Sequence, residues 1–300
     1  MNARTDPPRS RLHRLLKRFV DLRPEESVPA LLLFVYFFLI TSSAYIIKPG
    51  KISLFLHWLS ADKLPYAYLV TAVLIGFMVA LNARLLHRLN RLQYVSLSIL
   101  GFMATSVLFW VLFKFQWPWV FLLYWFWADL FIVTSVFQFW VLINDIFHPR
   151  QAKRLIGFFV SGGLLGGITG ALLASRLAKA VGTENLLLAC PVFLGFGLII
   201  LRRLKPHLAQ SPAGAPSGPD HEAAGKVGYA ESFRLIRGHR YLRLLSGIVA
   251  AGIAVTTLLD FQFNAIVEKS FPTQDARTSF IGTFFLGLLV CSYILNALLS

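Results

Sequence analysis

The sequence predicts an all-α polytopic membrane protein with about eight transmembrane helices. Of its 300 residues 56% are hydrophobic and only 14% are charged, and the apolar residues gather in long runs. A soluble domain carries about 25% charged residues, so this chain has too little polar surface to cover itself in water. A soluble enzyme, a disordered protein and a disulfide scaffold are poor descriptions of such a composition.

Eight apolar runs account for the predicted helices. A helix must be roughly 20 residues long to cross the hydrocarbon core of a membrane, because each residue adds about 1.5 Å. The runs lie at 28–47, 65–82, 93–113, 119–143, 156–174, 184–201, 244–266 and 278–300.

The basic residues predict the orientation of these spans. The chain has 29 Lys and Arg against 14 Asp and Glu, a formal net charge of +15. Loops on one side, at 1–27, 83–92, 144–155 and 202–243, hold 21 of the 29, and the other side holds 8. The positive-inside rule predicts that the amino terminus and the loop 202–243 lie in the cytoplasm. We expect the chain in the cell (inner) membrane. A nucleic-acid partner is not expected, because the basic residues alternate with apolar runs.

The segment 1–27, before the first apolar run, contains apolar and basic residues at helical spacing. Leucine, phenylalanine and valine at positions 12, 15, 16, 19 and 20 follow helical spacing, with Arg and Lys on the opposite face. This pattern is typical of an amphipathic helix that lies on an anionic lipid surface. We expect it to anchor the amino terminus to the bilayer.

A change of composition divides the chain. Residues 206–228, inside the basic loop 202–243, are rich in Pro, Gly, Ala and Ser and predict a flexible linker. It separates six spans at 28–201 from the spans at 244–300. Six helices, a long cytoplasmic linker and a second bundle form the layout of a major-facilitator transporter. Since only two spans follow the linker, we expect an incomplete second bundle. Channels and multi-span enzymes also have long loops.

Two acids interrupt the apolar runs. Asp129 lies near the middle of the fourth run, and Asp260 lies outward of the middle of the seventh. Charged groups at membrane depth are costly and are functional candidates by default. The alternative for each is a structural ion pair that holds helices together.

Two lysines follow the first run, in the sequence Lys48-Pro49-Gly50-Lys51. Proline and glycine predict a helix break there, and two ammonium groups beside freed backbone groups would form an anion site. Ordinary snorkelling of the lysines to the interface is the alternative. If the four charges converge, they line a charge-compensated cavity for an anion such as phosphate. Trp125, Trp127 or Trp140 could stack a base in such a cavity.

The fifth run is rich in glycine. Gly162, Gly166 and Gly170 recur every four residues, as do Gly163 and Gly167, so small faces allow another helix to approach closely. A phosphate-binding P-loop is excluded because the required Lys-Ser/Thr ending is absent. No HExxH, GxSxG or CxxC motif occurs, so neither an enzyme nor a cofactor or metal site is expected.

Three stretches, at 23–56, 127–175 and 256–272, together resemble the nucleotide transporter family, the ATP/ADP translocases of plastids and intracellular bacteria with their wider bacterial relatives. The resemblance implies a twelve-span, major-facilitator-like antiporter that exchanges ATP for ADP, sometimes with phosphate. It also implies that about four spans of the family are missing here.

The resemblance extends to the charged residues. The family's first-span motif Arg-Asp-Thr-Lys aligns with residues 48–51, so its final Lys is kept as Lys51, its Arg is replaced by Lys48, and its Asp and Thr are absent. An essential Glu in span four aligns with Asp129 and another in span seven with Asp260, each one methylene shorter. The resemblance thus implies that these four residues bind substrate.

These observations favour a nucleotide antiporter, in which Asp129 and Asp260 pair with the lysines when the site is empty. Two alternatives stay open. One is a transporter of the same fold for another solute, coupled to protons through Asp129 or Asp260. The other is a membrane-embedded partner protein without transport activity.

Overall fold

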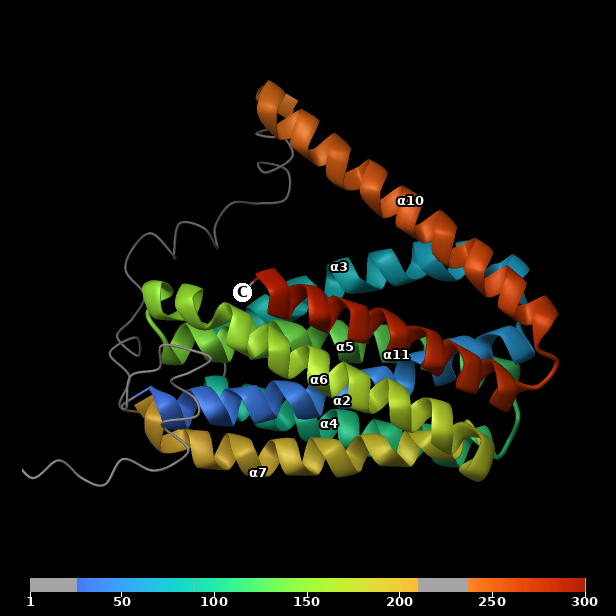
Figure 1. Cartoon of the computed structure of the whole chain (residues 1–300), viewed down its shortest axis with the longest axis horizontal. Helices are drawn as coiled ribbons and strands as arrows, with labels where there is room; N and C mark the ends of the chain where they lie inside the picture. The colour runs from blue at the N-terminus through green and yellow to red at the C-terminus, as the bar shows by residue number, and fades with distance from the viewer. Residues whose placement is uncertain (1–25, 89, 210–236, 300) are drawn as a thin grey trace, which may run out of the picture.

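The computed structural model describes residues 26–88, 90–209 and 237–299, and these are helical apart from short connections (Figure 1). No strand occurs within them. The predicted amphipathic helix of segment 1–27 and most of the predicted linker at 206–228 lie outside the described residues.

Eight long helices confirm the predicted fold class. They are α2 (Ser27–Trp58), α3 (Leu64–Arg88), α4 (Arg91–Phe113), α5 (Pro118–Ile146), α6 (Pro149–Val181), α7 (Ala189–Ala209), α10 (Arg240–Ser270) and α11 (Gln274–Leu299). Two short 3-10 helices, η1 (Ala61–Lys63) and η2 (Asn185–Leu188), precede α3 and α7. Among the described residues these are eight helices that are long and apolar enough to cross a membrane. The chain is a multi-pass membrane protein.

Local sequence explains several helix ends. Helices α5 and α6 begin at Pro118 and Pro149, where a missing N–H costs no intrahelical hydrogen bond. The backbone N–H of His148 donates to the side chain of Gln151 at 2.9 Å, which closes the first turn of α6. Gly182 ends α6 with a φ of 88°, a conformation that favours glycine.

The predicted helix break at Pro49 and Gly50 is wrong. Helix α2 runs without interruption for 32 residues and contains Pro49. Proline removes one backbone donor, but in a membrane helix neighbouring helices can hold the segment in place. Residues 49–56 of α2 are all buried, so packing on every side outweighs the local preference to bend.

Helix α2 is the central helix of the bundle. It packs against α5, α6, α7 and α11 and lies among them in Figure 1. Its fully buried side chains Leu33 and Tyr36 join a core with Phe121, Phe131 and Phe139 of α5, and its buried Phe55 joins a second core with Trp125 of α5. The residues that line the predicted anion site therefore belong to the most buried helix of the bundle.

The glycine-rich helix α6 lies directly on α2. A Cβ added at Gly166 would collide with the backbone carbonyl of Phe38, and one at Gly170 would collide with the backbone of Ser42. The hydroxyl of Ser42 donates to the carbonyl oxygen of Gly166 at 3.0 Å. Added Cβ atoms would meet aromatic side chains of α2 at three further positions, which are Gly162, Gly163 and Gly167.

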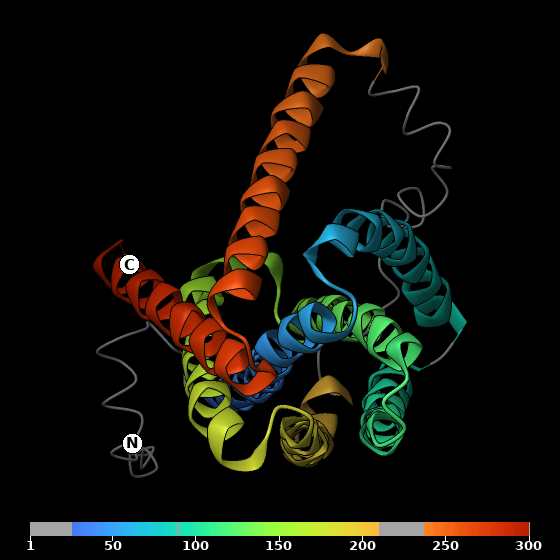
Figure 2. The ribbon, with the colours of Figure 1, turned by 90° about the vertical axis from the view of Figure 1, so that its right-hand side faces the viewer.

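Helix α10 diverges from the rest of the bundle. Figure 2 shows it leaving the other helices obliquely, while α11 returns along α6. Residues 243–256 of α10 are all exposed, whereas its last turns contact η1 and α2. A cavity forms in the angle between α10 and the first helices.

Candidate functional site

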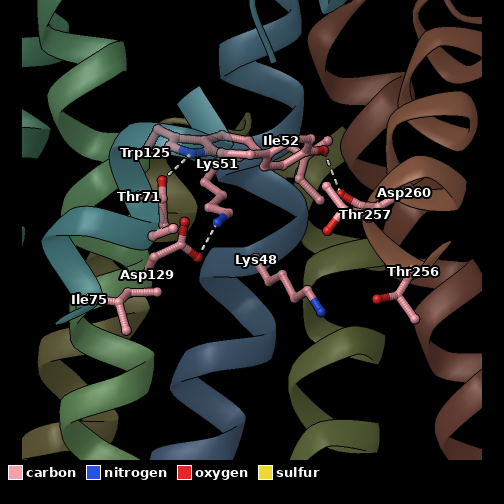
Figure 3. A pocket seen from close by; sticks show the side chains of 12 residues that line it. Lys48, Lys51, Ile52, Thr71, Ile75, Trp125, Asp129, Thr256, Thr257 and Asp260 are labelled. Atoms are coloured by element: carbon pink, nitrogen blue, oxygen red, sulfur yellow. Dashed lines mark hydrogen bonds and ion pairs between the residues drawn. The ribbon is translucent and has the colours of Figure 1, made fainter. Parts of the chain in front are cut away.

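The cavity between α10 and the first helices has a volume of about 470 Å³. Its walls come from α2, α3, α5 and α10 (Figure 3). All four charged residues singled out in the sequence line it, which are Lys48, Lys51, Asp129 and Asp260. The remaining lining residues are Ile52, Tyr68, Thr71, Ala72, Ile75, Trp125, Thr256 and Thr257.

Lys51 forms an ion pair with Asp129 across the α2–α5 contact. The side chain of Lys51 is 7% exposed and that of Asp129 is 21% exposed, so the carboxylate is the more exposed partner. The ammonium nitrogen also lies 4.1 Å from the centroid of the Trp125 ring, a cation–π contact. The indole N–H of Trp125 donates to the hydroxyl of Thr71 at 3.3 Å, which fixes the ring.

Lys48 lies on the same face of α2 as Lys51, three residues earlier. It forms no ion pair with any residue that the structure describes. Its ammonium nitrogen lies 4.4 Å from the ring centroid of Phe285 on α11 and 5.7 Å from that of Tyr45. Figure 3 shows its side chain extending away from Asp129 and toward α10. Lys48 is therefore a half-buried cation that lies against aromatic faces and, among the described residues, forms no ion pair.

Asp260 forms no ion pair with Lys48 or Lys51, contrary to the expectation for the empty site. Its Oδ2 accepts a hydrogen bond from the hydroxyl of Tyr68 at 2.6 Å and another from the amide nitrogen of Asn264 at 3.2 Å. Both donors are closer neighbours than the lysines, since Tyr68 projects from α3 and Asn264 lies one turn further along α10. Hydrogen bonds to a charged acceptor are strong, so they replace the ion pair.

The two lysines and two aspartates have a formal net charge of zero, but they form one ion pair and not two. Asp129 neutralises Lys51, whereas the charges of Lys48 and Asp260 are held apart by separate neutral partners. An anion that enters such a cavity meets Lys48 without first displacing a carboxylate. The arrangement can thus bind an anion by charge and return to balance when it leaves.

Tyr68 and Thr71 of the cavity wall, and the buried Asn264 beside Asp260, were not singled out from the sequence. Asn264 follows Asp260 by four residues, and this helical spacing could have revealed it. Tyr68 and Thr71 lie on α3 and reach the site only through tertiary packing. Of the three tryptophans considered for stacking, Trp125 lines the cavity.

The other two tryptophans lie elsewhere. Trp127 donates to Thr105 at 2.9 Å, and Trp140 packs against Phe139 in the core.

Polar contacts beyond the cavity attach the α10–α11 hairpin to the first six helices. The backbone N–H and the hydroxyl of Thr183 donate to Asp275 at 2.8 and 2.7 Å. The backbone N–H of Ala61 donates to Glu268 at 2.9 Å. Burial raises the pKa of the nearby Glu184 carboxyl, and a hydrogen bond with Gln274 partly offsets this effect. These contacts close the bundle at the end where α2 and α10 finish.

The opposite end of the bundle, where α2 and α6 begin, carries two ion pairs. Arg91 pairs with Asp145 between α4 and α5, and Arg154 pairs with Glu26 between α6 and the start of α2. No comparable contact attaches the described part of α10 at this end. The cavity is lined by Thr256, Thr257 and Asp260 in the middle of α10, so it lies between the attached end of this helix and the part that stands apart from the bundle.

Comparison of the chain with protein-family models, with curated proteins and with solved structures found no match. The functional assignment therefore rests on the residues and on the cavity that they form. In the described residues no group of three His, Cys, Asp or Glu side chains could hold a metal ion.

Proposed function

We propose that this protein is a membrane transporter that moves a phosphate-bearing anion by alternating access, with exchange of ATP and ADP as its most specific form. We place it in the cell membrane with its amino terminus in the cytoplasm. The observation that carries the proposal is the convergence of Lys48, Lys51, Asp129 and Asp260, from three helices, in one cavity at membrane depth.

Binding would begin at Lys48. This cation has no carboxylate partner among the described residues, and a phosphate can approach it without breaking an ion pair. A second phosphate oxygen would then compete with Asp129 for Lys51. A lysine ammonium is a compact point charge and is well suited to phosphate. The ring of Trp125 and the ring of Tyr68 provide flat apolar surface for the rest of the solute.

The position of the cavity between two sets of helices gives the conformational change of the proposed transport cycle. One wall is formed by α2, α3 and α5, and the other by α10. A solute that contacts both walls stabilises the conformation in which they close around it. A ligand shifts such an equilibrium only by its difference in affinity for the two states. Exchange follows if the empty carrier reorients slowly and the loaded carrier reorients quickly.

Counter-exchange in proteoliposomes tests the proposal. Vesicles that contain the purified chain are loaded with ADP, and uptake of labelled ATP is followed with and without internal ADP. We expect uptake that requires internal nucleotide and that falls at least tenfold in Lys48→Met, since a charge-assisted contact is worth about 1.5–3 kcal/mol. Lys63→Met is the matched control, because Lys63 is an exposed residue of η1 outside the cavity.

The result that contradicts the proposal is equally defined. Correctly inserted protein that takes up neither ATP, ADP nor inorganic phosphate under any gradient would remove the anion assignment. Equal loss of uptake in Lys48→Met and Lys63→Met would show that the overall positive charge of the protein, and not the cavity lysine, governs the activity.

A further inference from the structure

Asn264 is the most unusual polar residue near the cavity. Its side chain is completely buried, and its Oδ1 has no hydrogen-bond partner among the described residues. Its Nδ2 donates to Asp260 at 3.2 Å and to the hydroxyl oxygen of Tyr68 at 3.3 Å. A buried acceptor without a donor is costly, so a site that keeps one needs a physical reason.

The reason lies in the two ends of the amide. An amide presents two donors at its nitrogen and an acceptor at its oxygen, and the two ends have nearly the same shape. While Asp260 is a carboxylate, the nitrogen end of Asn264 must face it. A protonated Asp260 has an O–H to donate, and it would need the oxygen end instead. A rotation of the Asn264 amide by half a turn would bring its oxygen to face Asp260 when Asp260 is protonated.

We propose that Asp260 binds a proton together with the transported anion, with Asn264 and Tyr68 as its supporting groups. This inference rests on the proposed function and adds a coupling ion to it. Hydronium transfers a proton to Oδ2 of Asp260 and leaves as water, and after rotation of the amide the new O–H donates to Oδ1 of Asn264. Tyr68 keeps its own proton. One O–H bond of hydronium breaks, one O–H bond forms at Oδ2, and no oxidation state changes.

The charges around Asp260 make the two ligands assist each other. Lys48 and Lys51 from α2 favour the carboxylate, Asp129 from α5 opposes it, and Tyr68 from α3 stabilises it by hydrogen bonding. A phosphate bound to Lys48 cancels part of the lysine effect and brings negative charge, so it favours protonation of Asp260. In return, a protonated Asp260 leaves an excess positive charge that favours the anion, since such coupling is reciprocal.

The other charged groups on the elements around α10 are already engaged or lie outside the cavity. Glu268, two turns further along α10, accepts from the backbone of Ala61. Asp275 of α11 accepts from Thr183, and Arg277 donates to backbone carbonyl oxygens of Phe271 and Glu268 at the end of α10.

The two charged residues of η1, Asp62 and Lys63, are exposed and do not line the cavity. Of the two carboxylates in this cavity, Asp260 is thus the one whose hydrogen-bond partners are neutral. The unpaired Oδ1 of Asn264 is the acceptor available to its proton.

The pH profile of ADP binding tests the inference. Phosphate itself titrates with a pKa of about 6, so the readout is the difference between variants rather than the raw profile. We expect the affinity of the wild-type protein for ADP to rise as the pH falls, by up to tenfold per pH unit, because one proton binds together with the anion. Asp260→Asn imitates the protonated state, so it should bind as tightly as acidified wild type and should lose this part of the pH dependence.

A second pair of variants guards against misfolding of Asp260→Asn. Tyr68→Phe removes a donor to the carboxylate, so the midpoint of the profile should move upward by about one pH unit. Tyr36→Phe is the matched control, because the buried Tyr36 hydroxyl has no hydrogen-bond partner among the described residues. It should leave the midpoint in place. An unshifted midpoint in Tyr68→Phe would overturn the inference.

Infrared difference spectra separate this inference from the proposed function. A protonated carboxyl gives a C=O band that a carboxylate lacks, and addition of ADP should produce one in wild type but not in Asp260→Asn. Anion transport with identical pH dependence in both proteins, and no such band, would overturn proton coupling and leave the transporter standing. A band that appears on acidification alone, without anion transport at any pH, would instead overturn the proposed function and retain the proton site.

Discussion

Removing either partner of the buried ion pair between Lys51 and Asp129 should lower the free energy of unfolding, and the two losses should differ in size. Removing one partner of a buried pair costs about 3–5 kcal/mol because the other charge is left uncompensated. Asp129→Asn leaves the ammonium of Lys51, which is 7% exposed, beside a neutral amide and the face of Trp125, without its ion-pair carboxylate. We expect a loss of about 3 kcal/mol in the free energy of unfolding.

Lys51→Met should cost less than Asp129→Asn. The carboxylate that it leaves is 21% exposed to the cavity, where water can reach it. A loss of about 1–2 kcal/mol follows from partial desolvation. The double variant leaves no unpaired charge and should lose no more than about 2 kcal/mol, so the coupling between the two sites should be about 2–3 kcal/mol.

A double-mutant cycle measured by reversible unfolding in mixed detergent micelles checks these values. The order of the effects is the sharpest part of the prediction, because it depends on which partner is the more exposed. Additive losses in the double variant, or a larger loss in Lys51→Met than in Asp129→Asn, would refute the geometry described for this pair.

Two further predictions concern packing and pH. Gly166→Ala should lower the unfolding free energy by about 1–3 kcal/mol, because its Cβ would collide with backbone of α2; Gly101→Ala has nothing within 4 Å and should be neutral or stabilising by up to about 1 kcal/mol, and equal effects would contradict the close contact. Burial raises the pKa of Glu184 in the folded protein, so the folded state binds the proton more tightly. The unfolding free energy should therefore fall as pH rises from the ordinary glutamate range through the raised value, and Glu184→Gln should remove that slope in thermal melts.

The helices were predictable because membrane burial is a property of each segment by itself. A run such as 119–143 is predominantly apolar, although Asp129 interrupts it, and α5 contains it from end to end. The acids and lysines of the site were also visible, since a charge in an apolar run stands out. The error at Pro49 arose where packing of a whole helix outweighs a local preference.

The pairing of the charges could not be predicted from the sequence. Asp129 meets Lys51 as expected, but the partner of Asp260 is Tyr68, which lies 192 positions earlier in the chain. No periodicity connects two such residues. Asn264 was within reach of sequence reasoning, because residues four apart share a helix face, yet its buried and unpaired oxygen becomes apparent only in the structure.

The central claim is that the charge of Lys48 binds the transported anion, and chemical rescue tests it most directly. Lys48→Cys is prepared in a background with Cys190→Ala and Cys291→Ser, which replace the only two cysteines of the chain. Counter-exchange of ATP and ADP is then measured before and after reaction with an aminoethyl thiol reagent, which restores an ammonium, or with a neutral methyl reagent. We predict that the ammonium restores most of the exchange and that the methyl group restores none. Equal activity after both reagents would contradict the claim.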